Sequence, residues 1–162
     1  MGETCVREWP KMLNLSNKIL VAIDGSPASD KAAEEAVRLA AATSSEHFRS
    51  ILYAVIVLPA KEAPALTDLT LTPTRNRVDD WADKQRRIFY VVDKAAAEAS
   101  VQVRKEIIYG EVDEALLKFS EQEECDVIVI GSTGKGRVLR ALRGSVSSRV
   151  ALKAPCSVYI VR

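Results

Sequence analysis

The sequence predicts an α/β fold: one doubly wound domain with a mostly parallel five-stranded sheet and helices on both faces. Five short β-rich runs alternate with longer stretches of helical period, which is typical of βαβ units. The run at residues 51–58 is apolar throughout, as expected of a strand covered on both faces. Residues 127–130 are four consecutive β-branched residues, which favour a central strand.

We predict the first strand at residues 18–24 and a helix from Ser26 to about residue 42. Ser26 can cap this helix, and Pro27 fits its first position because the amide hydrogen that proline lacks would be unpaired there. Small apolar residues recur at helical spacing and let the helix lie close to the sheet; they are Ala33, Ala36, Val37 and Ala40.

Residues 50–58 are predicted to form a central strand, and residues 59–77, with three prolines and four threonines, a long surface loop. A helix should follow at about residues 79–100. Its inward stripe is predicted to contain Trp81, Ile88, Val92, Ala95 and Ala99.

The imperfect alternation of residues 101–109 indicates an edge strand. The next helix, near residues 113–124, should bury Leu116, Leu117 and Phe119 and expose Glu121, Glu123 and Glu124. Residues 126–131 form the fourth predicted strand. The last helix should begin at Gly144 and Ser145 and end before Pro155, and residues 157–161 form the last strand.

Length and composition fit an ordinary globular protein of one domain. The chain has 162 residues, of which 48% are hydrophobic and 28% charged, and this excludes collagenous and wholly disordered proteins. The longest apolar run has eight residues, too few for a membrane-spanning helix. No secretory signal is evident at the N-terminus, and the three cysteines form no metal-binding or disulfide pattern. We therefore expect a cytoplasmic protein with neither a membrane nor a nucleic-acid partner.

Basic residues are concentrated near the C-terminus. Residues 127–162 contain no acidic residue, although the whole chain has a net charge of only +1. The seven basic residues of this segment are Lys135, Arg137, Arg140, Arg143, Arg149, Lys153 and Arg162. This segment is either a solvated face or a site for an anion.

A loop rich in glycine joins the fourth strand to the last helix and has the chemistry of a phosphate site. Glycines let backbone amides approach an anion, and a helix N-terminus offers unpaired donors and a favourable dipole. Two common phosphate motifs do not match. Lys135 is followed by Gly136 and not by Ser or Thr, which excludes the Walker motif. The glycines also lack the dinucleotide spacing and follow the fourth strand, not the first, which makes NAD an unsuitable ligand.

The pattern that does match is Gly, two residues, Gly, nine residues, Gly and then Ser or Thr, present here as Gly131, Gly134, Gly144 and Ser145. With the segments KILVAIDGSPAS, CDVIVIGSTGKG, GSVSSRV and APCSVYIVR in order, the chain resembles the ATP-binding branch of the universal stress protein family. The resemblance covers residues 17–162, so residues 1–16 are interpreted as an N-terminal extension.

The resemblance implies the strand order 3-2-1-4-5, with ATP bound between strands 1 and 4. Asp24 would lie beside the nucleoside, and the backbone of Val55 would recognise the adenine edge. The ribose and phosphates would be surrounded by Gly131, Gly134, Gly144, Ser145, Val146 and Ser147. The sequence departs from the family at Ser148 and Arg149. The resemblance also implies a homodimer that pairs through the last strand.

Simpler roles for these residues remain open. Asp24 precedes Gly25, Ser26 and Pro27 and can be a turn residue, while Ser145 and Ser147 can be helix caps. We expect a cytoplasmic regulatory protein in which ATP occupancy orders the 131–144 loop and controls association with partners. The alternatives are a slow hydrolase that uses ATP with Mg²⁺, and a dimerisation module that binds no nucleotide.

Overall fold

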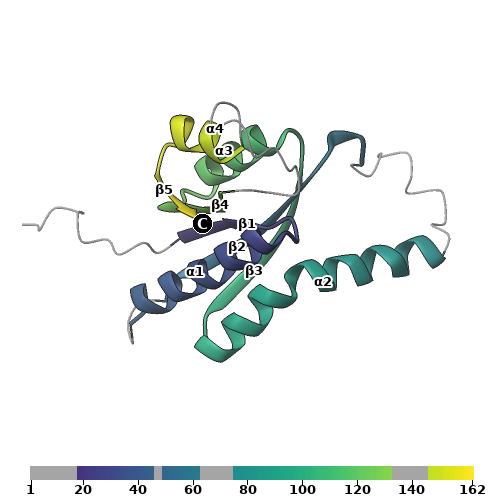
Figure 1. Cartoon of the computed structure of the whole chain (residues 1–162), viewed down its shortest axis with the longest axis horizontal. Coiled ribbons are helices and arrows are strands. Elements are labelled where there is room, and N and C mark those ends of the chain that lie inside the picture. Colours follow the sequence, from purple (N-terminus) through teal and green to yellow (C-terminus); the bar gives the residue numbers. More distant parts are fainter. Residues whose placement is uncertain (1–17, 46–48, 63–74, 133–145) are drawn as a thin grey trace, which may run out of the picture.

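The sheet has the predicted topology. The computed structural model describes residues 18–45, 49–62, 75–132 and 146–162, apart from the side chains of residues 75–81. Among these residues, five strands form one parallel sheet in the order β3-β2-β1-β4-β5 (Figure 1). The strands are β1 (Lys18–Ala22), β2 (Ile51–Leu58), β3 (Gln102–Tyr109), β4 (Val127–Gly131) and β5 (Ser157–Val161). The prediction that the second and fourth strands lie inside the sheet and the third at its edge is confirmed.

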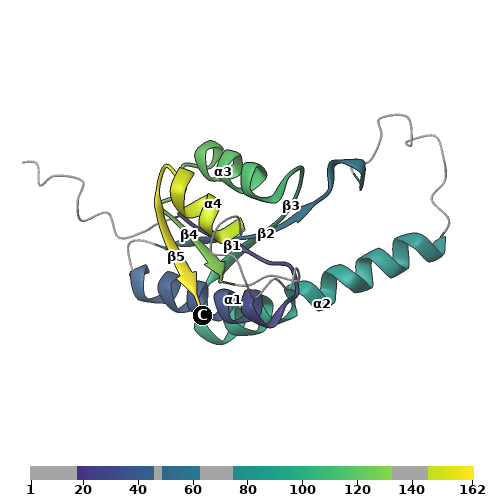
Figure 2. The same cartoon turned by 45° about the horizontal axis from the view of Figure 1, so that its top comes forward.

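Helices cover both faces of the sheet, as predicted. Figures 1 and 2 show α1 and α2 on one face and α3 and α4 on the other. Each face has its own apolar core: Ile19 and Val21 of β1 point toward α1 and α2, whereas Leu20 points toward the other pair. The helices are α1 (Pro27–Thr43), α2 (Arg75–Ala99), α3 (Val112–Gln122) and α4 (Val146–Lys153), with a short 3-10 turn, η2 (Ala60–Glu62), after β2.

The start and the buried face of α1 agree with the sequence. Ser26 caps the helix and Ser29 completes a capping box: the Ser29 amide donates to Ser26 Oγ at 3.2 Å, and the Ser26 amide donates to Ser29 Oγ at 3.1 Å. Pro27 is the first helical residue. All four small residues predicted to face the sheet are buried, namely Ala33, Ala36, Val37 and Ala40.

The predictions for α2 were right in part. The helix begins at Arg75, four residues before the predicted start. Of the predicted stripe, Val92 is buried and Ile88 and Ala95 pack against the core, but Ala99 is exposed, and the buried Phe89 and Ala96 were not predicted. The stripe is rotated because α2 packs against both α1 and β3, and a periodic pattern alone does not define the direction of the partner. The side chain of Trp81 lies outside the described residues.

The acidic end of α3 is not wholly solvated. Glu121 and Glu124 are exposed as predicted, but Glu123 is half-buried and accepts a hydrogen bond from the Tyr53 hydroxyl at 2.8 Å. Tyr53 itself is buried in β2, with its ring edge-to-face against Phe119 at a centroid distance of 5.5 Å. The hydroxyl of a buried tyrosine needs a polar partner, and the carboxylate supplies it.

Candidate functional site

The candidate site lies where the strand order reverses, at the carboxyl ends of β1 and β4. In an open α/β sheet the crevice at this reversal is where ligands bind. The two strands pair from Ile19 opposite Val127 to Val21 opposite Val129. Beyond this point β1 ends at Ala22 beside β2, and β4 ends at Gly131 beside β5. The turn after β1 leads into α1, and the chain after β4 returns at the start of α4. Residues from three separate segments therefore meet at one end of the sheet.

Asp24 is a turn residue with its carboxylate at this end of β1. It is half-buried, and its Oδ1 accepts the Ser26 amide at 2.8 Å across Gly25, which has a φ of +73°. The turn therefore requires an acceptor at position 24 and a residue tolerant of positive φ at position 25. This geometry confirms the turn role of Asp24 and uses one of its carboxylate oxygens.

Negative charge gathers around the β1 turn. Burial, followed by the charges of Asp24 and Glu34, raises the pKa of Asp30 above its ordinary value. An acidic environment of this kind favours ligand groups that donate hydrogen bonds, such as hydroxyls and amines, over groups that accept them.

Gly131 is the last residue of β4 and lies against the first turn of α1. A Cβ at this position would lie 2.8 Å from both the carbonyl carbon and the carbonyl oxygen of Ala28, and 3.0 Å from its Cβ. The next amide, that of Ser132, donates to the Val161 carbonyl at 2.7 Å. From the sequence, this glycine is interpreted as a position where an anion can come close to the backbone amides. The structure shows a further reason for it, the close packing of β4 on α1.

The start of α4 faces inward at the same end of the molecule. Val146 is half-buried and packs against the core that contains Leu20 and Ile128, and Ser147 is buried. Of the other predicted site residues, Gly134, Gly144 and Ser145 lie outside the described residues. The interpretation of Ser145 as a helix cap lies outside them as well.

Val55 contributes backbone and not side chain. Its side chain is fully buried in the core of the sheet, and its carbonyl accepts the Ile23 amide at 2.9 Å, one residue beyond the end of β1. At this position of β2 a ligand could therefore contact only main-chain atoms. This is the kind of contact that the resemblance implies for Val55.

The sequence did not predict an ion pair that fixes α4. Arg149 Nε donates to Asp113 Oδ2 at 2.6 Å, and Nη2 donates to Oδ1 at 3.0 Å. The guanidinium holds the pKa of Asp113 below its ordinary value, although burial acts in the opposite direction. One cation of the basic segment is thus engaged by α3. The two residues are 36 positions apart, and no local pattern links them.

Within the described ranges, no three His, Cys, Asp or Glu side chains are grouped so that they could hold a metal ion. No helix of the described part is both long and apolar enough to cross a membrane.

Comparison with known proteins identifies the relatives of this chain. The model of the universal stress protein family matches residues 16–162. A universal stress protein of Methanocaldococcus jannaschii is 32% identical over 149 residues, which cover 92% of this chain and 84% of the relative. The solved structure of the universal stress protein UspA from Lactobacillus plantarum superposes with a TM-score of 0.68 at 26% identity, covering 91% of this chain and 98% of that one.

Two further solved structures share the fold and contain nucleotides. One is a universal stress protein in complex with cAMP, with a TM-score of 0.66 at 21% identity, covering 91% of this chain and 98% of that one. The other is a universal stress protein from Archaeoglobus fulgidus in complex with dAMP, with a TM-score of 0.62 at 18% identity, covering 91% and 99%.

Proposed function

We propose a function that starts from the family, since this chain belongs to the universal stress protein family. The protein is a regulatory protein that binds an adenine nucleotide, and the nucleotide is ATP. The observation that carries the proposal is the meeting of the Asp24 turn, Gly131 and the start of α4 at the β1–β4 crevice. The complexes of two relatives of the same fold with cAMP and dAMP support the adenine class.

Charge gives the nucleotide a direction in the crevice. The acidic β1 turn, with Asp24 and Asp30, suits the ribose hydroxyls and the adenine amine, which donate hydrogen bonds. The phosphates would lie toward the start of α4, where the helix dipole favours negative charge. Four of the seven basic residues of the C-terminal segment come shortly before α4 in the sequence; they are Lys135, Arg137, Arg140 and Arg143.

Occupancy of the crevice would be the signal. The segment 131–144 leads from the end of β4 toward the start of α4. A nucleotide that contacts both ends of this segment would therefore couple the conformation of the segment to ligand binding. We propose that partner association follows from this link. The cytoplasmic location stays a prediction of the sequence.

Two substitutions at Asp24 separate a ligand role from a turn role. Asp24→Asn keeps an oxygen that can accept the Ser26 amide but removes the charge, whereas Asp24→Ala removes both. Calorimetry with ATP should show affinity reduced about 10-fold to 100-fold by Asp24→Asn, because hydrogen bonds to a charged acceptor are lost. Thermal unfolding without ATP should change more for Asp24→Ala than for Asp24→Asn. Unchanged ATP affinity in both variants would leave Asp24 with the turn role alone.

Nucleotide preference and turnover need separate measurements. Calorimetry with ATP, ADP, AMP and GTP should show adenine preference, and Gly134→Val should weaken binding because a large side chain blocks the approach of the phosphates. A protein with no affinity for any of the four ligands would refute the proposal. Phosphate release with and without Mg²⁺ tests the alternative of slow hydrolysis; release no faster than in buffer eliminates it.

We also propose a homodimer that pairs through β5. Among the residues that the structure describes, this strand pairs only with β4, and its Tyr159 and Ile160 are 45% and 38% exposed. An apolar edge of this kind is usually covered by another chain. Sedimentation at micromolar concentration should give twice the monomer mass of 17.8 kDa, and Ile160→Lys should shift the equilibrium toward monomer. A monomer at this concentration would refute the dimer.

A further inference from the structure

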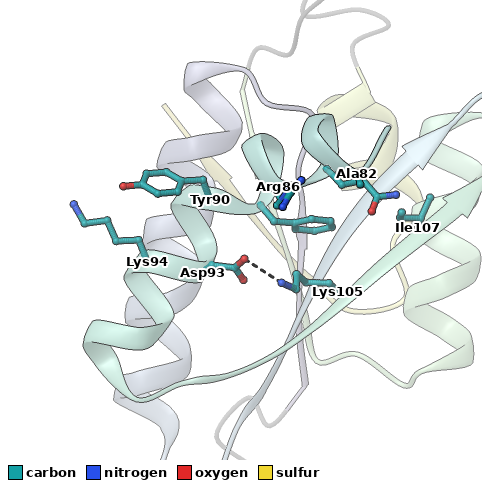
Figure 3. A pocket seen from close by; sticks show the side chains of 9 residues that line it. Ala82, Arg86, Tyr90, Asp93, Lys94, Lys105 and Ile107 are labelled. Carbon is teal, nitrogen blue, oxygen red and sulfur yellow. Dashed lines mark hydrogen bonds and ion pairs between the residues drawn. The ribbon is translucent and has the colours of Figure 1, made fainter. Parts of the chain in front are cut away.

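A groove of about 700 Å³ lies between α2 and β3, at the edge of the sheet opposite β5. Figure 3 shows it from close by. It is lined by one face of α2, from Ala82 to Lys94, and by Lys105 and Ile107 of β3. The strand β2 separates β3 from β1, so the groove is distinct from the β1–β4 crevice. None of the residues predicted to contact the nucleotide lines it.

The floor of the groove is apolar and aromatic. Phe89 is almost fully buried and belongs to the core between α1, α2 and the sheet, and Ile107 packs against the same core. Tyr90, at the rim, is 62% exposed. Small-ligand sites typically measure about 300–1,000 Å³ and combine apolar walls with a few charged groups. The groove has the volume and lining of such a site.

The charged groups around this floor are mostly cations. Among the residues whose side chains the structure describes, Arg86, Lys94 and Lys105 line the groove together with one carboxylate, that of Asp93. Asp93 Oδ2 accepts Lys105 Nζ at 3.0 Å, so the one carboxylate is already neutralised by one of the three cations. Figure 3 shows this pair spanning from α2 to β3. The described lining therefore carries a net charge of +2, which falls to +1 when Asp83, the partner of Arg86, is counted.

Arg86 and Lys105 are each paired with an exposed carboxylate, Asp83 and Asp93 respectively, which an incoming anion would replace. Arg86 pairs with Asp83, one helical turn earlier, and both side chains are exposed. Arg86 lines the groove, but Asp83 does not. Pairs of this kind contribute little, so the guanidinium can exchange its partner for a ligand at small cost. Lys105 Nζ lies 5.6 Å from the centre of the Phe89 ring. A negative group here would lie beside an aromatic floor.

We propose that the groove between α2 and β3 binds a small organic anion with a flat aromatic body. The rings would lie on Phe89 and Ile107, and the acid group would contact Arg86 and Lys105. A guanidinium suits this role because its planar donors match an acid group. A phosphate or sulfate without an apolar body would leave the floor uncovered, and an uncharged aromatic molecule would leave the cations without a partner.

The test compares two probes that differ in the acid group alone. The dye 8-anilinonaphthalene-1-sulfonate carries the anion, and N-phenyl-1-naphthylamine has the same ring skeleton without it. Both become fluorescent in apolar sites, so titration of the folded protein gives both affinities. We expect the sulfonate to bind more tightly, and its affinity to fall about tenfold in Arg86→Gln and in Lys105→Gln, in line with the loss of a charged hydrogen bond. The affinity of the neutral dye should change less than about twofold in each.

The chain provides a matched control for Arg86. Arg38 on α1 is 68% exposed and pairs with Glu35 three residues earlier, whereas Arg86 is 76% exposed and pairs with Asp83 at the same spacing. Arg38→Gln should leave both dye affinities unchanged. Near-ultraviolet circular dichroism of every variant verifies that the dye reports a site in the folded protein. Equal affinities for the two dyes, or an equal loss in Arg38→Gln and Arg86→Gln, would overturn the proposal.

A last pair of measurements separates this site from the nucleotide site. Asp24→Asn should leave the sulfonate affinity unchanged, and Arg86→Gln should leave the ATP affinity unchanged. Either proposal can therefore fail while the other holds. Loss of sulfonate binding in Asp24→Asn with retention in Arg86→Gln would place the anion in the β1–β4 crevice and overturn the groove as its site.

Discussion

Arg149 of α4 donates two hydrogen bonds to the Asp113 carboxylate of α3, one from Nε at 2.6 Å and one from Nη2 at 3.0 Å. The two side chains differ in exposure: 8% for Asp113 and 41% for Arg149. Asp113 also lies in the first turn of α3, where the helix dipole favours a negative charge. The pair joins the two helices that cover one face of the sheet, and it holds α4, whose first turn borders the candidate site.

The unequal exposure predicts unequal effects of removing each partner. Arg149→Met leaves a nearly buried carboxylate without its donor, whereas Asp113→Asn leaves an arginine that water can solvate. We expect Asp113→Asn to lower the free energy of unfolding by about 1 kcal/mol, and Arg149→Met to lower it further. Urea unfolding of both variants and of the double variant measures the coupling. Equal losses, with no recovery in the double variant, would contradict this account.

The same pair predicts a pH dependence with a definite sign. The hydrogen bonds from Arg149 lower the pKa of Asp113 below its ordinary value of 3.8, so folding favours the charged carboxylate. Its contribution to stability is present above the ordinary pKa and is lost as the pH falls through the lowered one. The stability difference between the natural protein and Asp113→Asn should be constant from about pH 7 to pH 5 and shrink below about pH 4. A difference independent of pH would refute the charge as its cause.

Features set by local pattern were predictable from the sequence. The buried runs of β2 and β4, the cap at Ser26 and the small-residue face of α1 each depend on neighbours within a few residues, and all were confirmed. The strand order followed from the resemblance and not from a pattern. The charged partners of Tyr53 and Arg149 were missed because each pair joins residues at least 36 positions apart.

The candidate site was predictable in its place but not in its contacts. Asp24, Val55, Gly131, Val146 and Ser147 lie at or near the expected end of the sheet, yet the contact between Gly131 and Ala28 depends on how closely α1 approaches β4. The groove beside β3 escaped prediction for the same reason. The groove depends on the angle between the axis of α2 and the strand β3, and helical periodicity does not specify that angle.

Tyr53→Phe tests the link between the core and the acidic end of α3. The substitution keeps the ring against Phe119 and removes the hydroxyl that donates to Glu123 at 2.8 Å. We expect a loss of about 1–2 kcal/mol in the free energy of unfolding, because the lost hydrogen bond has a charged acceptor. Glu123→Gln keeps an acceptor and should cost less in the same urea titration. A Tyr53→Phe protein of unchanged stability would show that Glu123 is satisfied by water alone.

Cys125 should be inert toward alkylation in the folded protein. Burial, followed by the charges of Cys156 and Glu123, raises the pKa of the Cys125 thiol from 9.0 to about 12. Because the thiolate is the reactive form, its fraction near pH 8 falls about 1,000-fold. Iodoacetamide labelling read by peptide mass spectrometry should modify Cys125 only after urea is added. The half-buried Cys156 is the internal comparison. Equal labelling of Cys125 with and without urea would contradict its protection.

Gly131→Ala decides whether the glycine at the end of β4 serves packing, the ligand or both. The new methyl group would lie 2.8 Å from backbone atoms of Ala28, which cannot move without shifting the first turn of α1. We expect a loss of about 1–3 kcal/mol in the free energy of unfolding without nucleotide, the usual range for overpacking. Ser132→Ala is the neighbouring control, since its amide still donates to Val161. If Gly131→Ala has unchanged stability but weaker ATP binding, the glycine serves the ligand alone. If it loses stability and keeps its ATP affinity, packing is sufficient to explain the glycine.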